Sequence, residues 1–262
     1  MKTLRLIGTG LFAVLLCCAF VSCSGDDEDD PNPPGQEVPA PDGDGDTGQG
    51  GGDSSEDDAI QGEGGVNAGD AKAVDLGLPS GTLWADRNIG ADSPEDYGDY
   101  FAWGETEPKD YYYDDSYKWC NGSIRVNLTK YCTDSSYGIV DNKTVLDAED
   151  DAATANWGDK WRMPTKADFN EIKFNCTFTW TVQNGVNGYK VTGPNGNYIF
   201  LPAAGERRAD SLNDAGSFGR YLSSSLDMDD PYYAWSIRFY SGHFNTQSCG
   251  RENGITVRAV VK

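Results

Sequence analysis

The chain has 262 residues and a formal net charge of −21, from 42 acidic against 21 basic side chains. Contacts to nucleic-acid phosphates need clusters of Lys and Arg, so this balance argues against a nucleic-acid partner. The seven cysteines have no zinc-site spacing, and the single histidine, His243, offers no partner set for one.

Residues 1–22 have the pattern of a lipoprotein signal peptide. Lys2 and Arg5 give a positive start, and the apolar run that follows is short for a membrane span. The run ends in Ser22 and Cys23, and a small residue before a cysteine is what a lipoprotein signal peptidase requires. We therefore expect lipid attachment at Cys23 and a membrane anchor through it. Ordinary secretion and an uncleaved anchor are the alternatives.

Residues 23–70 form the next segment, and we expect a disordered acidic tether. Residues 24–70 contain 15 acidic residues, 12 Gly and five Pro, with no Lys, Arg or aromatic residue. Such a composition cannot bury enough apolar surface to offset chain entropy. The segment 42–46 (DGDGD) begins like a calcium loop but lacks the later Glu ligand.

An acidic run lies directly after the proposed anchor, at Asp26, Asp27, Glu28, Asp29 and Asp30. It resembles the export signal of surface lipoproteins in Bacteroidota, which implies an outer-membrane protein exposed at the cell surface. The alternative is a solvated spacer.

Residues 71–262 have the length of one domain, with 19 basic and 27 acidic residues and a balance of −8. Alternation and turn residues predict three early strands, over Ala73–Leu76, Thr82–Asn88 and Asp99–Gly104. The region from Glu105 to Asn142 is polar and aromatic with few aliphatic residues, so we expect long loops there.

Two short helices should follow. Asp147 can cap a helix over Ala148–Asn156, and Gly158 can end it. Thr165 can cap a second helix over Lys166–Phe174. The two tryptophans between them, four residues apart, predict an aromatic elbow in the core.

The pattern then changes to the two-residue period of strands. Further strands are predicted over Thr177–Val182, Gly188–Thr192, Asn197–Leu201, Ala234–Tyr240 and Ile255–Val261. The expected fold class is therefore α+β, with two short helices, a mainly antiparallel sheet and long loops.

Several ordered motifs resemble one family. They are AVDLGLPSGTLWADRNIG, YFAWGET, NWGDKWRMPT, GYKVTGPNGNYIFLPAAG, YLSSSL, AWSIRF and a closing VRAV. Together they resemble the Fibrobacter succinogenes major paralogous domain, over roughly residues 73–262. The resemblance implies a fold similar to C-type lectin-like and formylglycine-generating-enzyme domains, and it implies no settled function.

Four cysteines fall in the domain. An even number in an exported chain favours disulfides, and we expect Cys120–Cys132 within the long loop and Cys176–Cys249 between distant strands.

We expect a non-catalytic module that binds a glycan or an extracellular protein. The candidate ligand-binding rings are Tyr111, Tyr112, Tyr113, Tyr117 and Trp119. The alternative is that these rings pack the loop onto the domain. No cofactor is expected, although three carboxylates near one another, Asp227, Asp229 and Asp230, are a weak candidate for calcium, with a solvated loop as the alternative.

Other functions have less support in the sequence. A structural part of a surface assembly, such as a fimbrial tip, is the first alternative. An enzyme like the formylglycine-generating oxidases would need a late pair of cysteines, and only Cys249 lies there. A hydrolase triad would depend on His243 without a Gly-x-Ser-x-Gly elbow.

Overall fold

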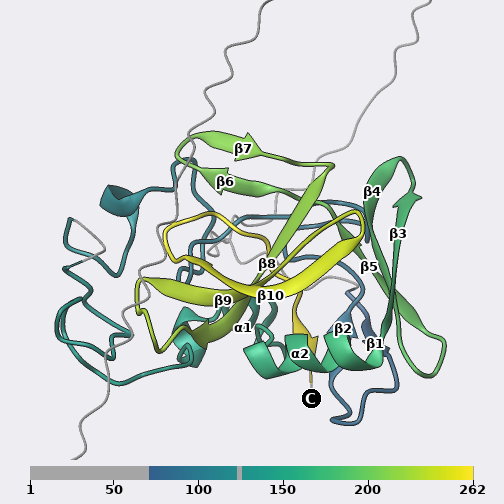
Figure 1. Cartoon of the computed structure of the whole chain (residues 1–262), viewed down its shortest axis with the longest axis horizontal. Helices are drawn as coiled ribbons and strands as arrows, with labels where there is room; N and C mark the ends of the chain where they lie inside the picture. The colour runs from purple at the N-terminus through teal and green to yellow at the C-terminus, as the bar shows by residue number, and fades with distance from the viewer. Residues whose placement is uncertain (1–70, 123–125, 262) are drawn as a thin grey trace, which may run out of the picture. The chain divides into compact units, whose positions relative to one another are not determined.

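The structure, a computed structural model, describes residues 71–122 and 126–261 (Figure 1). The proposed signal peptide, Cys23, the acidic run and the 42–46 segment lie outside the described residues. None of the described helices is long and apolar enough to cross a membrane.

Short antiparallel strands make up most of the regular structure. They are β1 (Ala73–Asp75), β2 (Leu83–Ala85), β3 (Thr177–Gln183), β4 (Val186–Thr192), β5 (Tyr198–Pro202), β6 (Glu206–Arg208), β7 (Ser211–Asn213), β8 (Phe218–Leu226), β9 (Tyr233–Tyr240), β10 (His243–Gly250) and β11 (Val260–Val261).

These strands form separate small sheets. Three have three strands each, in the orders β1-β2-β11, β10-β9-β8 and β3-β4-β5, and β6 pairs with β7 as a hairpin. Every strand pair is antiparallel. The expected α+β class with a mainly antiparallel sheet is confirmed.

Two short α-helices lie where the caps predict them, α1 (Ala152–Trp157) and α2 (Lys166–Asn175). Thr165 caps α2 as expected. Asp151 caps α1 in place of Asp147, which instead precedes a 3-10 turn, η2 (Ala148–Asp150). The carboxylate of Asp151 accepts hydrogen bonds from three backbone groups, two in α1 and one at Met163. It therefore ties the start of α1 to the segment before α2.

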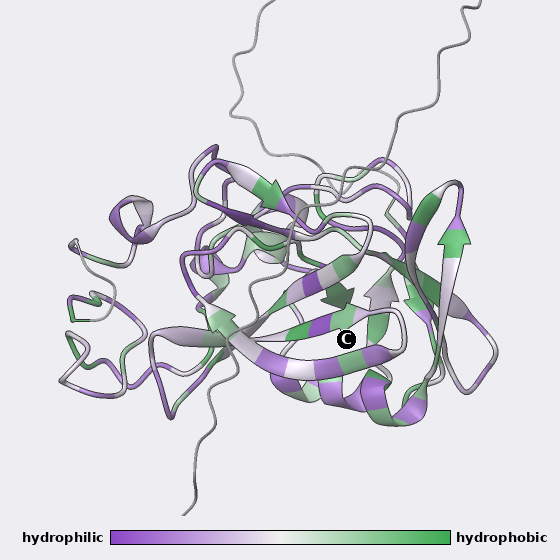
Figure 2. Ribbon diagram, turned by 45° about the horizontal axis from the view of Figure 1, so that its top comes forward, coloured by the Kyte–Doolittle hydropathy of each residue, from purple (hydrophilic) through white to green (hydrophobic). Residues whose placement is uncertain are grey.

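The predicted aromatic elbow is present between the helices. The rings of Trp157 and Trp161 lie 5.2 Å apart in an edge-to-face contact, and both are buried. Gly158 turns the chain there with φ +86°, which glycine adopts without the strain that a side chain would add. Figure 2 shows hydrophobic and hydrophilic segments alternating along α2, as expected of a helix buried on one face.

One predicted strand is absent. The segment 99–104 makes a single bridge, between Phe101 and Ile255, and no strand ladder. Its side chains are almost all buried, so packing holds this segment rather than a sheet. Four strands were not predicted, namely β6, β7, β8 and β10.

The long loop after Gly104 has a small core of its own. This loop core consists of buried residues from several segments, namely Tyr100, Ala102, Tyr112, Tyr117, Leu128, Cys132 and Tyr232. A 3-10 turn, η1 (Asp114–Ser116), lies within the loop.

Neither expected disulfide is formed, and all four cysteines of the described region are free thiols. Cys120 packs against the loop core and Cys132 belongs to it. Cys249 is in the core cluster that contains α1, whereas Cys176 packs against the other main cluster. Aromatic packing, and not a cross-link, therefore holds the long loop.

Candidate functional site

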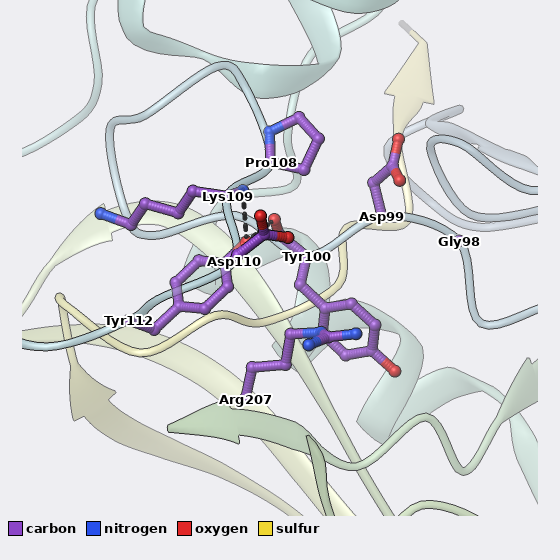
Figure 3. Close-up of a pocket in the computed structure, with 8 residues that line it drawn as sticks. All are labelled: Gly98, Asp99, Tyr100, Pro108, Lys109, Asp110, Tyr112 and Arg207. Atoms are coloured by element: carbon purple, nitrogen blue, oxygen red, sulfur yellow. Dashed lines mark hydrogen bonds between the residues drawn. The ribbon is translucent and has the colours of Figure 1, made fainter. Parts of the chain in front are cut away.

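A pocket of about 320 Å³ opens between the 98–112 segment and β6 (Figure 3). Its lining contains four charged residues, Asp99, Lys109, Asp110 and Arg207. In Figure 3 the guanidinium of Arg207 lies against the ring of Tyr100, and the carboxylate of Asp99 points away from it. We call this the Asp99–Arg207 pocket. The remaining lining residues are Gly98, Tyr100, Pro108 and Tyr112.

Tyr112 fixes the walls of the pocket. Its backbone exchanges two hydrogen bonds with Ala209, at 2.9 and 2.8 Å, which attach the loop to the β6–β7 turn. Its hydroxyl donates to the carbonyl of Tyr100 and accepts from the amide of Lys109. Its ring lies so close to Gly254 that a Cβ there would sit 2.8 Å from ring atoms. These contacts position both sides of the pocket rigidly.

Arg207 enters the pocket from β6 without a charged partner. Its amide donates to the carbonyl of Gly254 at 2.8 Å, and its guanidinium lies 5.2 Å from the ring centre of Tyr100. Among residues 71–122 and 126–261, the guanidinium makes no hydrogen bond or ion pair. Five donor groups therefore remain for a ligand or water.

Asp99 also lines the pocket without a charged partner among the described residues. Its carboxylate rests against Gly90, where an added Cβ would sit 2.2 Å from Oδ2. Burial raises the pKa of the Asp99 carboxyl above its ordinary value, and no described side chain donates a hydrogen bond to it. Asp110 is exposed and likewise has no ion pair within the described part of the chain.

A second cavity of about 390 Å³ adjoins the first along the same loop. Lys109 lines both cavities. Its ammonium lies 2.8 Å from Glu105 and 2.7 Å from the carbonyl of Ser116. The Lys109 ammonium therefore already has hydrogen-bond partners within the protein, whereas the Arg207 guanidinium has none among the described residues.

The five candidate rings divide between core and surface. Tyr112 and Tyr117 are both buried in the loop core. Tyr112 lines the Asp99–Arg207 pocket, whereas Tyr117 does not. The buried hydroxyl of Tyr117 donates a hydrogen bond to the carbonyl of Trp103 and accepts one from the guanidinium of Arg251. Half-buried Trp119 donates to Gly104 at 2.8 Å and packs against this core.

Tyr111 and Tyr113 remain available, with 42% and 54% of their surface exposed. Their rings lie 6.1 Å apart, and Tyr111 directly follows Asp110 of the pocket. Of the predicted rings, these two have the exposure that ligand contact needs.

The weak calcium candidate is not supported by the geometry. Asp227 accepts from the amide of Asp229, and Asp230 accepts from the amide of Tyr232, so the carboxylates belong to separate turns. They do not converge on a common point among the described residues.

A different set of acids does converge, Asp147, Glu149 and Asp150. Lys130 places its ammonium among them, at 2.9, 3.2 and 2.6 Å respectively. Burial opposes the charge of Lys130, but these hydrogen bonds raise its pKa above the ordinary value. Lys143 also pairs with Asp147 and Lys118 with Asp150, so three lysines together balance the three carboxylates.

Asp99, Asp110 and Arg207 were not predicted as site residues. Asp99 fell in a predicted strand, and Arg207 lies in the short charged run Glu206-Arg207-Arg208. The bridge between Tyr112 and Ala209 and the contact of Arg207 with the Tyr100 ring bring these segments together. The sequence carries no local signal for that long-range contact.

Comparisons with family models, with curated proteins and with solved structures find no match for this chain.

Proposed function

We propose that this chain is an outer-membrane lipoprotein that displays a non-catalytic carbohydrate-binding domain at the cell surface. The signal pattern before Cys23, the acidic run and the following tether support the anchoring and exposure. The motif resemblance supports assigning the domain to the Fibrobacter succinogenes major paralogous family, with a C-type lectin-like form of the α+β fold.

The unpaired charges of the Asp99–Arg207 pocket carry the proposal for binding. A sugar presents neighbouring hydroxyls that both donate and accept hydrogen bonds. A carboxylate and a guanidinium in one pocket suit that pattern, because one accepts and the other donates. The Asp99 carboxylate packs against Gly90 and the Arg207 guanidinium lies 5.2 Å from the Tyr100 ring centre, and these contacts reduce the ordering needed when a ligand binds.

The neighbouring exposed rings complement the pocket. Tyr111 and Tyr113 offer apolar ring faces, and the C–H face of a sugar can pack on such rings. A glycan that fills the pocket with one residue can place the next residue against Tyr111. This arrangement favours an extended glycan over a single free sugar.

The test is a glycan array probed with the mature protein, followed by calorimetry on the strongest glycan. Arg207→Gln removes the charged donor and shortens the side chain. Because a hydrogen bond to a charged group contributes about 1.5–3 kcal/mol, we expect affinity to fall roughly 10- to 100-fold.

The matched control is Arg208→Gln, which makes the same charge change one residue away. Arg208 is exposed, pairs with Glu206 and does not line the pocket. We expect its affinity to match the wild type. Equal loss in both variants, or binding that survives Arg207→Gln unchanged, would contradict this site.

A further inference from the structure

Strand β3 is an outer edge of the β3-β4-β5 sheet. Figures 1 and 2 both show it at the periphery of the domain, with no strand on its outer side. It pairs with β4 over seven consecutive residues, Thr177–Gln183, without a bulge. The edge is therefore long and regular.

The turn after β3 shows which backbone groups face outward. Asn184 and Gly185 both have positive φ, +47° and +84°, as a type I′ two-residue hairpin requires. In that hairpin the flanking residues, Gln183 and Val186, form a hydrogen-bonded pair. Every second residue from Gln183 then bonds to β4, so the N–H and C=O groups of Phe178, Trp180 and Val182 point away from it. No hydrogen bond from the described residues reaches these outer groups.

The usual protection of an edge strand is missing from β3. Its sequence, TFTWTVQ, contains no charged residue, no Pro and no Gly. Natural proteins place Lys, Pro or bulges on exposed edges to prevent pairing with another chain. Val182 also keeps 61% of its surface exposed beside this edge.

We propose that β3 pairs antiparallel with β3 of a second copy of this chain, joining two three-stranded sheets into one. A two-fold axis at Trp180 aligns Phe178 with Val182 of the second copy and Thr179 with its Thr181. The outward groups of residues 178, 180 and 182 then meet in three hydrogen-bonded pairs. Each such pair exchanges two bonds, so all the outward groups are satisfied.

The side chains fit the same register. Directly opposite residues in an antiparallel pair share a face of the sheet. In this register apolar Phe178 and Val182 meet on one face, and Thr179 and Thr181 meet on the other. The pairing covers exposed Val182 with an aromatic ring. A shift by one residue would oppose apolar and threonine side chains instead.

A charge-swap experiment tests the register. The mature full chain is studied by sedimentation equilibrium in density-matched detergent. Wild type should form dimers as its concentration rises. The double variant Thr179→Lys, Thr181→Lys puts like charges opposite each other, and we expect at least a tenfold weaker dimer.

The matched variant is Thr179→Lys, Thr181→Glu, which puts opposite charges across the same axis and should keep dimerisation near the wild-type level. Both sites lie on the polar face, and Thr179 is exposed, so circular dichroism should show an unchanged fold. A wild type that stays monomeric, or a double-lysine variant that dimerises as strongly as the lysine–glutamate one, would overturn the proposal.

A cross-link adds a geometric check. The variant Thr179→Cys, Thr181→Cys places cysteines in non-hydrogen-bonded pairs, whose Cα atoms lie about 4.5 Å apart, within disulfide range. Mild oxidation should give a covalent dimer. The control, Thr179→Cys alone, keeps the same four native thiols, Cys120, Cys132, Cys176 and Cys249. It should not cross-link, because the residue opposite position 179 remains threonine. Covalent dimers from both variants alike, or from neither, would overturn the register.

Discussion

At the residue scale, two fully buried arginines, Arg251 and Arg258, hold loop segments together through hydrogen bonds. Neither forms an ion pair with a described carboxylate, and both donate instead to carbonyl, hydroxyl and amide oxygens. The guanidinium of Arg251 bonds to Tyr117 and to the carbonyls of Lys130, Tyr131 and Pro231. One side chain therefore joins three loop segments that are far apart in sequence.

We expect Arg251→Lys to destabilise the domain by about 3 kcal/mol, because an ammonium cannot reproduce a planar fork and leaves buried carbonyls unpaired. For a domain of this size the melting temperature should fall by roughly 6–12 °C. Thermal unfolding by circular dichroism measures this. Arg238→Lys is the control, since half-buried Arg238 makes a single long bond of 3.4 Å to Gln247. Equal melting temperatures for the two variants would refute the role of Arg251.

At the scale of elements, the sequence predicts what depends on neighbouring residues. Thr165 starts α2 and Gly158 ends α1 because a cap needs only the adjacent turn. The β3–β4 hairpin follows from strict alternation and the Asn184-Gly185 turn.

Elements that depend on distant contacts were missed. Strand β8, FGRYLSSSL, is buried on both faces and so shows no alternation. Strand β10, HFNTQSCG, has few residues that favour strands. The candidate pocket was missed for the same reason, because Asp99 and Arg207 are 108 positions apart in the chain.

The α2 cap leads to a pH-dependent prediction. Burial opposes the charge of Asp168, but hydrogen bonds from Arg162 and Thr165 lower the pKa of its carboxyl. A lowered folded pKa contributes stability above the unfolded value of about 3.9, and this stability is lost as pH falls through the folded value.

Asp168→Asn should therefore cost about 1–2 kcal/mol at neutral pH, since it weakens the capping box and the contact with half-buried Arg162. The difference from wild type should shrink below about pH 4. Urea unfolding at several pH values measures it, with exposed Asp159→Asn as the control. A difference that stays constant down to pH 2 would contradict the assignment.

At the scale of the whole molecule, buried tyrosines should set the alkaline limit of stability. Burial raises the pKa of Tyr100, Tyr117, Tyr131 and Tyr221 above the ordinary value. Each hydroxyl donates to a fixed oxygen, so ionisation would break a hydrogen bond as well as bury a charge. One buried base acts in the opposite sense, since burial lowers the pKa of Arg258 to about 10.

Taken together, the directions of these pKa shifts predict a net loss of stability above pH 10. A raised tyrosine pKa contributes stability that is complete below the unfolded value, about 10, and is lost as pH rises above it. Each group loses about 1.4 kcal/mol per pH unit, so four lose roughly 5 kcal/mol per unit. Arg258 offsets about one such share, which leaves a net loss of roughly 4 kcal/mol per pH unit. Because a domain is stable by about 5–15 kcal/mol, we expect unfolding within roughly one to four pH units above 10. Absorbance at the phenolate band should rise in two phases, and the second should coincide with loss of near-ultraviolet circular dichroism. Tyr221→Phe removes one of the four groups, so the stability lost per pH unit should fall by about 1.4 kcal/mol. If every tyrosine ionised while the dichroism persisted, these rings would not be the residues that limit stability in alkali.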